Sequence, residues 1–483
     1  MSLLGFAPWE WLALVEHELL LFAGFFFLLG ALDEFAVDLI WIWLKLTGRA
    51  KVARLAEEKA SSPLLGRAAV FIPAWQEERV IGTTVAHALA VWPQQDWRLY
   101  IGCYRNDSAT AEAARFASRG DPRLHIVTLD SDGPSTKADC LNWLYRAMEQ
   151  DEARSGKAFQ MVVLHDAEDM VDPAALTVLD AAICGSDHSS RADFVQLPVL
   201  PMPQPGSPWI SGHYCEEFAE AHGKGLVVRD AISAGIPAAG VGCANSRQIL
   251  AQMAAMQSSQ LPFAADCLTE DYELGLNVTA LGARGRFLRL RHSDGRLVAT
   301  RAFFPARIDQ SVRQKTRWVH GIALQSWDRL GWSSRGGRSG LAEIWMRLRD
   351  RRGPLTALVL ALAYLLLALA ALGWGAAQMG YAVAWPLSPA MEALLIANFV
   401  GFGWRILWRF AFKLREYGPG QAVMAIFRIP VANIIAIMAG RRAVMAYLQT
   451  LRGKAIFWDK TSHDAHSVWI ASRKATQRRS GAL

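Results

Sequence analysis

The chain has 483 residues, of which 52% are apolar, and its mean hydropathy of +0.14 is high for a soluble protein. This length is too great for one simple core and predicts two or three structural units. The net charge of +7 gathers beside the apolar segments and in the C-terminal tail, which favours an anionic membrane surface and disfavours nucleic acid as the partner. The six cysteines form no C-x-x-C pair and are interpreted as reduced, cytoplasmic thiols.

The first apolar segment, residues 19–46, is long enough to cross a bilayer. Residues 1–18 carry glutamates and no lysine or arginine, so this segment is not a secretory signal peptide. Basic residues follow at once, and the positive-inside rule therefore places the N-terminus outside and the next residues in the cytoplasm. Asp33 and Glu34 interrupt the segment, either where the helix bends into the interface or as an acid pair facing a helix bundle. Residues 1–50 are predicted to form an N-terminal transmembrane helix.

Residues 65–345 alternate between short apolar runs and helix-length segments. The predicted strands are 68–73, 97–105, 124–130, 161–166 and 192–199, and the clearest helices are 78–91 and 109–119. This alternation predicts an α/β domain with a mostly parallel sheet covered on both faces. Ligands of such sheets bind beyond the carboxyl ends of the strands. Neither G-x-G-x-x-G nor G-x-x-x-x-G-K-[ST] occurs there, which disfavours a dinucleotide site and a P-loop.

The run VVLHDAEDMVDP, residues 162–173, places four acids directly after a predicted strand. They are Asp166, Glu168, Asp169 and Asp172. Carboxylates so close repel one another, so the cluster predicts a bound cation, a solvated helix start, or both. Asp172, which precedes Pro173, is predicted to cap the next helix.

Two further apolar segments lie within residues 354–385 and 391–412, and each is predicted to hold one transmembrane helix of the unit 354–412. Arginines precede the first, and arginine and lysine close the second, while the link at 386–390 has no charge. The link is therefore predicted outside and both basic flanks in the cytoplasm.

The stretch 420–453 is predicted to form interfacial helices on the cytoplasmic face, with a transmembrane helix as the alternative. A span here would carry the basic residues that follow it to the outside. The tail, residues 454–483, is basic and is predicted to be cytoplasmic and either disordered or lying on the membrane.

Six motifs occur in order between these predicted spans: PAWQEERVI, RNDSAT, STKADCLNW, HDAED, TEDYELG and QKTRW. Their order resembles that of family-2 inverting glycosyltransferases, most closely the membrane-bound, polysaccharide-synthase-like branch. HDAED and the closing FWDKTSHDAHSV resemble the phage adsorption protein B family. The resemblance covers nearly the whole chain and implies a cytoplasmic GT-A type domain that binds a nucleotide sugar, flanked by transmembrane helices.

The resemblance assigns the acidic run to the sugar donor. The family's Asp-x-Asp motif is matched by Asp166-Ala167-Glu168, which is longer by one methylene. It implies that Asp166 contacts the nucleotide ribose or a metal, that Glu168 binds Mg²⁺ or Mn²⁺, and that Asp169 is the alternative ligand. Such a cation neutralises charge on the departing diphosphate.

TEDYELG matches the region of the family that holds the catalytic base, and Asp271 stands at the base position. An inverting transfer needs one carboxylate to take the proton of the acceptor hydroxyl. Thr269 is predicted to cap the helix that begins near Asp271, with Glu270 in its first turn.

RQKTRWVHG places Gln314, Arg317, Trp318 and Gly321 on one helix face. The resemblance implies that this face serves the leaving group and the acceptor, because Arg317 can fork onto a diphosphate and Trp318 can stack on a sugar ring. The alternative is an amphipathic helix that docks on the membrane with Trp318 as its anchor.

The predicted nucleotide contacts also follow from the resemblance: Pro73, Ala74, Glu77, Asn106, Asp107, Lys137 and Asp166. The segment YRND around Asn106 departs from the family's usual DDGS. Residues 240–247 either belong to the acceptor side or form a joint between strand and helix. His165 and His320 are interpreted as packing or supporting groups rather than metal ligands.

The sequence thus predicts an inverting, metal-dependent glycosyltransferase of the bacterial inner membrane. Its donor is predicted to be a UDP-sugar, with an N-acetylhexosamine favoured, and its acceptor a growing cell-envelope glycan such as an exopolysaccharide. The alternatives are transfer of one sugar to polyprenyl phosphate and a non-catalytic membrane receptor or scaffold. The other expected partners are the lipid bilayer and either a periplasmic or outer-membrane export partner or a second copy of the chain.

Overall fold

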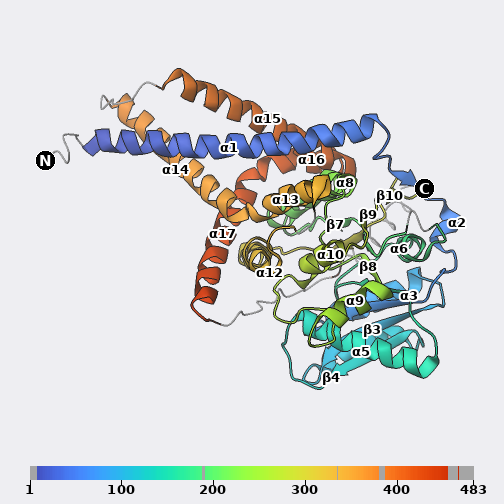
Figure 1. The fold of residues 1–483 in the computed structure, drawn as a ribbon. Helices are drawn as coiled ribbons and strands as arrows, with labels where there is room; N and C mark the ends of the chain where they lie inside the picture. Colours follow the sequence, from blue (N-terminus) through green and yellow to red (C-terminus); the bar gives the residue numbers. More distant parts are fainter. Residues whose placement is uncertain (1–7, 188–190, 334–335, 380–386, 455–465, 467–483) are drawn as a thin grey trace, which may run out of the picture.

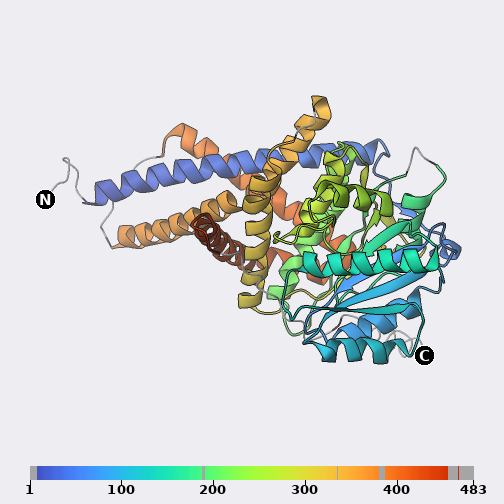
Figure 2. The same cartoon turned by 60° about the horizontal axis from the view of Figure 1, so that its bottom comes forward.

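The computed structural model describes residues 8–187, 191–333, 336–379, 387–454 and 466. It shows an α/β domain from which long helices project to one side (Figures 1 and 2). Of the predicted basic tail, only Lys454 and His466 fall within these residues.

The domain is built on a seven-stranded sheet with the strand order β4-β3-β2-β5-β8-β6-β9. In chain order its strands are β2 (Ala68–Pro73), β3 (Trp97–Tyr104), β4 (Leu124–Leu129), β5 (Met161–Leu164), β6 (Phe194–Gln196), β8 (Cys243–Ser246) and β9 (Gly285–Phe287). Strands β4, β3, β2 and β5 are mutually parallel, and only β8 runs antiparallel to its neighbours. This confirms the predicted α/β fold with a mostly parallel sheet.

One predicted strand is wrong in its extent. The run at residues 192–199 is broken at Pro198, which has no N–H to donate to a ladder. The chain forms the short β6 before this proline, and β7 (Val199–Pro201) after it pairs with β11 (Thr300–Ala302) in a separate small sheet. A second small sheet pairs β1 (Ala53–Arg54) with β10 (Leu290–Arg291).

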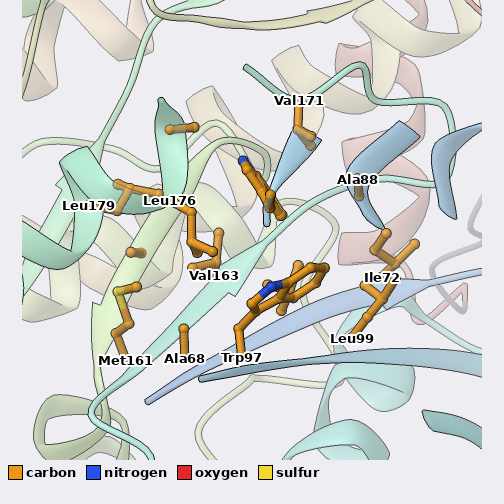
Figure 3. Packing of buried hydrophobic residues seen from close by; sticks show 14 of the residues in the cluster. Ala68, Ile72, Ala88, Trp97, Leu99, Met161, Val163, Val171, Leu176 and Leu179 are labelled. Atoms are coloured by element: carbon orange, nitrogen blue, oxygen red, sulfur yellow. The ribbon is translucent and has the colours of Figure 1, made fainter. Parts of the chain in front are cut away.

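Helices cover both faces of the main sheet, as the apolar strands require. They are α3 (Ile81–Val91), α4 (Ser108–Ser118) and α6 (Ala175–Cys184) on one face, and α5 (Lys137–Ser155), α9 (Arg247–Met256) and α10 (Glu270–Ala280) on the other. Side chains alternate across a strand, so Val70 and Ile72 of β2 join the first layer and Phe71 the second. Figure 3 shows the first layer, where Val163 of β5 packs beside Leu176 and Leu179 of α6.

Among the described residues, four helices are long and apolar enough to cross a membrane. These are α1 (Pro8–Leu46, apolar over Ala13–Leu46), α14 (Gly353–Gln378), α15 (Pro389–Tyr417) and α17 (Ile429–Leu451). The first three cover the apolar segments that were predicted to span, and their crossing of a membrane stays a prediction. The fourth lies in the stretch predicted to be interfacial.

Arg428 divides that stretch into α16 (Pro419–Phe427) and α17. Its fully buried guanidinium donates to the carbonyl of Pro208 (2.6 Å) and lies 3.3 Å from the carboxylate of Glu216. In Figure 1 α17 runs downward at a steep angle to α1. This course fits an interfacial helix, while the length and composition of α17 fit a span, so its placement stays a prediction.

Helix α13 (Gly337–Arg351) joins α1 to the α/β domain. Helix α1 continues unbroken through Asp33 and Glu34, and Arg349 of α13 binds both carboxylates. The next residue, Asp350, accepts a hydrogen bond from the hydroxyl of Tyr272 on α10 (2.7 Å). The two acids therefore face the helix bundle, and α13 connects them to the helix that carries Asp271.

Candidate active site

A cavity of about 430 Å³ lies at the carboxyl ends of β2 and β5. It brings together most of the predicted site residues: Pro73, Ala74, Glu77, Lys137, Asp166, Glu168, Asp169, Asp271, Gln314, Arg317 and Trp318. These residues come from segments spread over more than half of the chain. Their convergence follows from the parallel strands, whose carboxyl ends meet at one edge of the sheet.

The acidic run forms a turn directly after β5. Asp166 and Glu168 are half-buried and line the cavity, whereas Asp169 is 1% exposed. The Asp169 carboxylate binds Nδ1 of the buried His165 (2.8 Å) and accepts the N–H of Asp166 (3.1 Å). Asp169 therefore stabilises the turn through these buried contacts, and His165 supports Asp169 as predicted.

Asp172 does more than the predicted helix cap. One carboxylate oxygen accepts the N–H of Ala174 (3.0 Å), but α6 begins only at Ala175. The same buried carboxylate also pairs with His292 (2.8 Å) and Arg301 (3.2 Å). These partners lower the pKa of Asp172 against the opposing effect of burial, so its main role is an internal ion pair that fixes the end of the acidic turn.

The donor set suits a hard divalent cation. Asp166 and Glu168 supply carboxylate oxygens on the cavity side, and the ammonium of Lys137 lies 2.6 Å from Asp166. Among the described residues, no group of three or more His, Cys, Asp or Glu side chains is disposed to hold a metal ion. Mg²⁺ commonly binds through one or two carboxylates together with substrate phosphates, so two carboxylates fit this chemistry.

Asp271 stands in the first turn of α10 and faces the same cavity. Its Oδ1 accepts the N–H of Tyr272 (2.7 Å). Burial raises the pKa of Asp271, the charge of Asp166 raises it further, and Lys137 opposes both. The neighbouring Glu270 is also buried, and burial together with Asp271 raises its pKa to about 7. Both carboxylates can therefore exchange a proton more readily than exposed ones.

The predicted cap at Thr269 is wrong. Thr269 occupies the N-cap position, but its side chain accepts no N–H, and among the described residues its buried hydroxyl has no hydrogen-bond partner. The side chain instead packs on Gly321, where a Cβ atom would approach its Oγ1 and Cγ2 to 2.5 Å. The glycine lets the chain after Trp318 press against the start of α10.

Residues 240–247 form the predicted joint between strand and helix, and their contact with an acceptor stays a prediction. Gly240 has φ +74°, and a Cβ atom there would lie 2.5 Å from Oδ2 of Asp271. This glycine therefore borders the candidate base, in a conformation that favours glycine. Cys243–Ser246 forms β8, and the Ser246 hydroxyl caps α9 by accepting the N–H of Ile249 (3.1 Å).

The QKTRW motif ends α11 (Ile308–Trp318), which continues as a π-helical turn (Val319–Gln325). Gln314, Arg317 and Trp318 line the cavity, and the buried Oε1 of Gln314 has no partner among the described residues. On its other side α11 packs against α17, where the hydroxyl of Thr316 lies 3.5 Å from the carbonyl of Ala439. The motif thus lies between the cavity and an apolar helix.

Sequence reasoning missed an aromatic group beside Trp318. The rings of Tyr214, Phe218 and Phe304 lie with their centroids 6.1, 6.2 and 6.4 Å from that of Trp318. Tyr214 and Phe218 are four residues apart on α7 (Ile210–Glu220), a spacing that places them on one helix face. That spacing was the available signal, but it could not show that the face meets Trp318.

The side of the cavity next to β2 and β3 also contains unpredicted aromatic residues. Trp75 and Tyr104 line it, with ring centroids 5.1 Å apart. Asn106 and Asp107 do not line it. Asn106 exchanges two hydrogen bonds with the backbone of Gly133, and Asp107 accepts the N–H of Gln76 (2.6 Å). These two residues shape the adjoining loops, and their contact with a nucleotide stays a prediction.

Comparison with known proteins gives one family. Residues 66–321 match the model of "Glycosyltransferase like family 2". Bacteriophage adsorption protein B of Escherichia coli K12 and bacteriophage N4 adsorption protein B of Escherichia coli O157:H7 are each 30% identical to the chain over 471 residues. These alignments cover 91% of the chain, which spans only 61% of the length of either relative.

Solved structures show more remote similarity. The mannosyltransferase PcManGT of Pyrobaculum calidifontis, in complex with GDP-Man and Mn²⁺, is 16% identical with a TM-score of 0.48, over 83% of this chain and 98% of that one. Glucosyl-3-phosphoglycerate synthase of Mycobacterium tuberculosis, with Mn²⁺, UDP and phosphoglyceric acid, is 15% identical with a TM-score of 0.34, over 55% and 79%.

Proposed function

Because the chain belongs to glycosyltransferase family 2, we propose that it transfers a sugar from a UDP-linked donor to a growing cell-envelope glycan, with inversion at the anomeric carbon. The observation that carries this proposal is the convergence on one cavity of three groups of side chains from separate segments of the chain. They are the carboxylates after β5, the carboxylate of Asp271, and the Arg317–Trp318 pair.

Each group has a separate task in direct displacement. Asp271 takes the proton of the acceptor hydroxyl, and its raised pKa makes it a stronger base than an exposed aspartate. Arg317 donates to the diphosphate as charge grows on it. Asp166 and Glu168 would hold Mg²⁺ or Mn²⁺, which supplies further neutralisation of the diphosphate when bound.

Lys137 lies between the donor and base regions. Its ammonium pairs with Asp166, and it is 3.5 Å from the carbonyl of Gly240, which borders Asp271. The surrounding carboxylates keep Lys137 charged against burial, since Asp166, Glu270 and Asp271 all raise its pKa. A charged lysine at this point suits a phosphate of the donor.

The aromatic group favours a sugar as the acceptor. Trp318, Phe218 and Phe304 line the cavity, and sugar rings bind aromatic ring faces through their C–H surfaces. Four helices able to cross a membrane, with basic residues directly after α1, suit catalysis at the cytoplasmic face of a bacterial inner membrane. An N-acetylhexosamine is the sugar that we favour, and an exopolysaccharide the product.

The test is nucleotide release by the purified full chain in detergent, measured with a panel of UDP-hexoses and UDP-N-acetylhexosamines and with GDP-mannose as the comparison. We expect UDP release and sugar incorporation with one UDP-sugar, and loss of both in the Asp271→Asn variant. Release no faster than that of Asp271→Asn with every donor would refute the enzymatic proposal and favour a receptor or scaffold.

A further inference from the structure

A second cavity, of about 1370 Å³, lies away from the active site. It is an open cavity lined by the last turn of α1, the linker that follows α1, the end of α6, and the domain edge at β9 and β10. It shares no lining residue with the candidate active site. The catalytic proposal therefore leaves it unexplained.

Cations predominate in the lining of this cavity. They are Lys45, Arg49, Lys51, Lys59, Arg284, Arg286 and Arg289, against the carboxylates of Asp180 and Asp230. Both carboxylates are already engaged. Asp180 accepts the backbone N–H groups of Leu65 (2.6 Å) and Gly66 (3.0 Å), and Asp230 pairs with Arg286 (3.0 Å). The cavity thus holds an excess of positive charge that its own acids do not balance.

Arg289 shows this imbalance at a buried position. Its side chain is 7% exposed and pairs with Glu416 (2.6 Å), but the same Glu416 oxygen also binds Arg291. The Nε–H of Arg289 is buried and has no acceptor among the described residues. Burial, with the adjacent Arg291, lowers the pKa of Arg289 to about 10. An additional anion would satisfy this donor and relieve the repulsion.

The remaining lining suits an amphiphile at a membrane surface. Leu55, Leu288 and Leu290 supply apolar walls, and Trp43 and Leu44 belong to the last turn of α1, where the apolar stretch ends. If α1 crosses a bilayer, as its length and composition support, the cavity borders the lipid headgroups. Basic residues at this level attract anionic lipids.

We propose that this cavity binds the phosphate headgroup of an anionic membrane lipid. The proposal concerns binding and does not depend on the sugar transfer proposed above. A free phosphate ion has the same charge chemistry, but the apolar walls favour a lipid over an ion.

The experiment is a titration of the detergent-purified full chain with phosphatidylglycerol, followed by native mass spectrometry. The test variant combines Arg49→Gln, Lys51→Gln and Lys59→Gln, which are exposed and form no ion pair among the described residues. The control variant removes three exposed arginines outside the cavity: Arg115→Gln, Arg119→Gln and Arg154→Gln. Both variants lose the same net charge, so non-specific attraction falls equally in the two.

We expect the test variant to bind phosphatidylglycerol roughly tenfold more weakly or worse, since each removed cation contributes to the attraction, while the control binds as the parent does. Equal affinity of the test variant and the parent would overturn the proposal, as would an equal loss in both variants. Equal binding of zwitterionic phosphatidylcholine would also overturn it. Displacement of the lipid by millimolar inorganic phosphate would overturn the lipid assignment and indicate a site for the free ion.

Discussion

Asp271→Asn tests the assignment of the catalytic base most directly. The amide keeps the size of the side chain and can still accept the N–H of Tyr272, which Oδ1 of Asp271 accepts at 2.7 Å. The ion pair between Lys137 and Asp166, at 2.6 Å, is also retained. The donor side of the cavity should therefore keep its geometry, and only the proton acceptor is lost.

The expected loss follows from the role of a general base, which typically contributes about 10²–10⁴-fold to the rate, or roughly 3–5 kcal/mol of the barrier. Burial raises the pKa of Asp271 and so makes it a stronger base, which places the expected loss in the upper part of that range. UDP affinity should change little, because the base acts on the acceptor and not on the nucleotide.

The assay is UDP affinity by calorimetry beside the single-turnover transfer rate, for the parent, Asp271→Asn and Glu270→Gln. Glu270→Gln is the matched control, since Glu270 is the neighbouring buried carboxylate of the same helical turn. An Asp271→Asn rate above about a tenth of the parent rate would refute the assignment, because that exceeds what loss of a general base allows. A larger loss in Glu270→Gln would move the base to Glu270.

Three further outcomes are expected. Excess EDTA should abolish transfer, and Mg²⁺ or Mn²⁺ should restore it. The Glu168→Gln variant should need a higher metal concentration for its half-maximal rate. Full activity in EDTA would remove the metal assignment. Trp318→Ala should slow glycan growth more than hydrolysis of the donor, measured as sugar incorporation against UDP release, because the proposed function places the ring against the acceptor. Equal loss of both would argue against that role. Burial raises the pKa of Glu270 above its ordinary 4.5 to about 7, so the stability that the protonated side chain contributes to the fold is lost as pH rises through about 7. Glu270→Gln should therefore raise the midpoint of thermal unfolding more near pH 8 than near pH 5. A pH-independent difference would contradict the buried, proton-holding state of Glu270.

The sheet could be predicted because its central parallel strands, such as β2 and β5, are buried on both faces and appear as short apolar runs. Phe71 and Val163, for example, stand in runs in which all the remaining residues are also apolar, and both of their strands begin at the predicted residue. Pro198 also has apolar neighbours in the sequence. The break that it causes depends on the pairing of β7 with β11 in a sheet separate from the main one. Pairing between residues about a hundred positions apart is not visible in a local pattern.

The site was predictable at the positions where a side chain acts alone at a strand or helix end. Asp166 and Asp271 are of this kind, and both line the cavity. Thr269 failed because its helix start is pressed against Gly321, a contact between distant segments that replaces the local cap. The aromatic neighbours of Trp318 were missed for the same reason, since Tyr214 and Phe218 of α7 stand about a hundred positions before it in the chain.

The link through α13 bears on how this enzyme domain can be isolated. Asp33 and Glu34 of α1 hold Arg349, the adjacent Asp350 holds the hydroxyl of Tyr272, and Tyr272 follows the candidate base. A soluble fragment that begins at residue 65 would lack Asp33 and Glu34. Arg349 would then lose both of these carboxylates, and α13 could shift relative to α10. Helix α1, a candidate membrane span, is thus also part of the scaffold of the candidate active site. Expression of the globular portion alone should therefore give a domain that binds nucleotide better than it turns over.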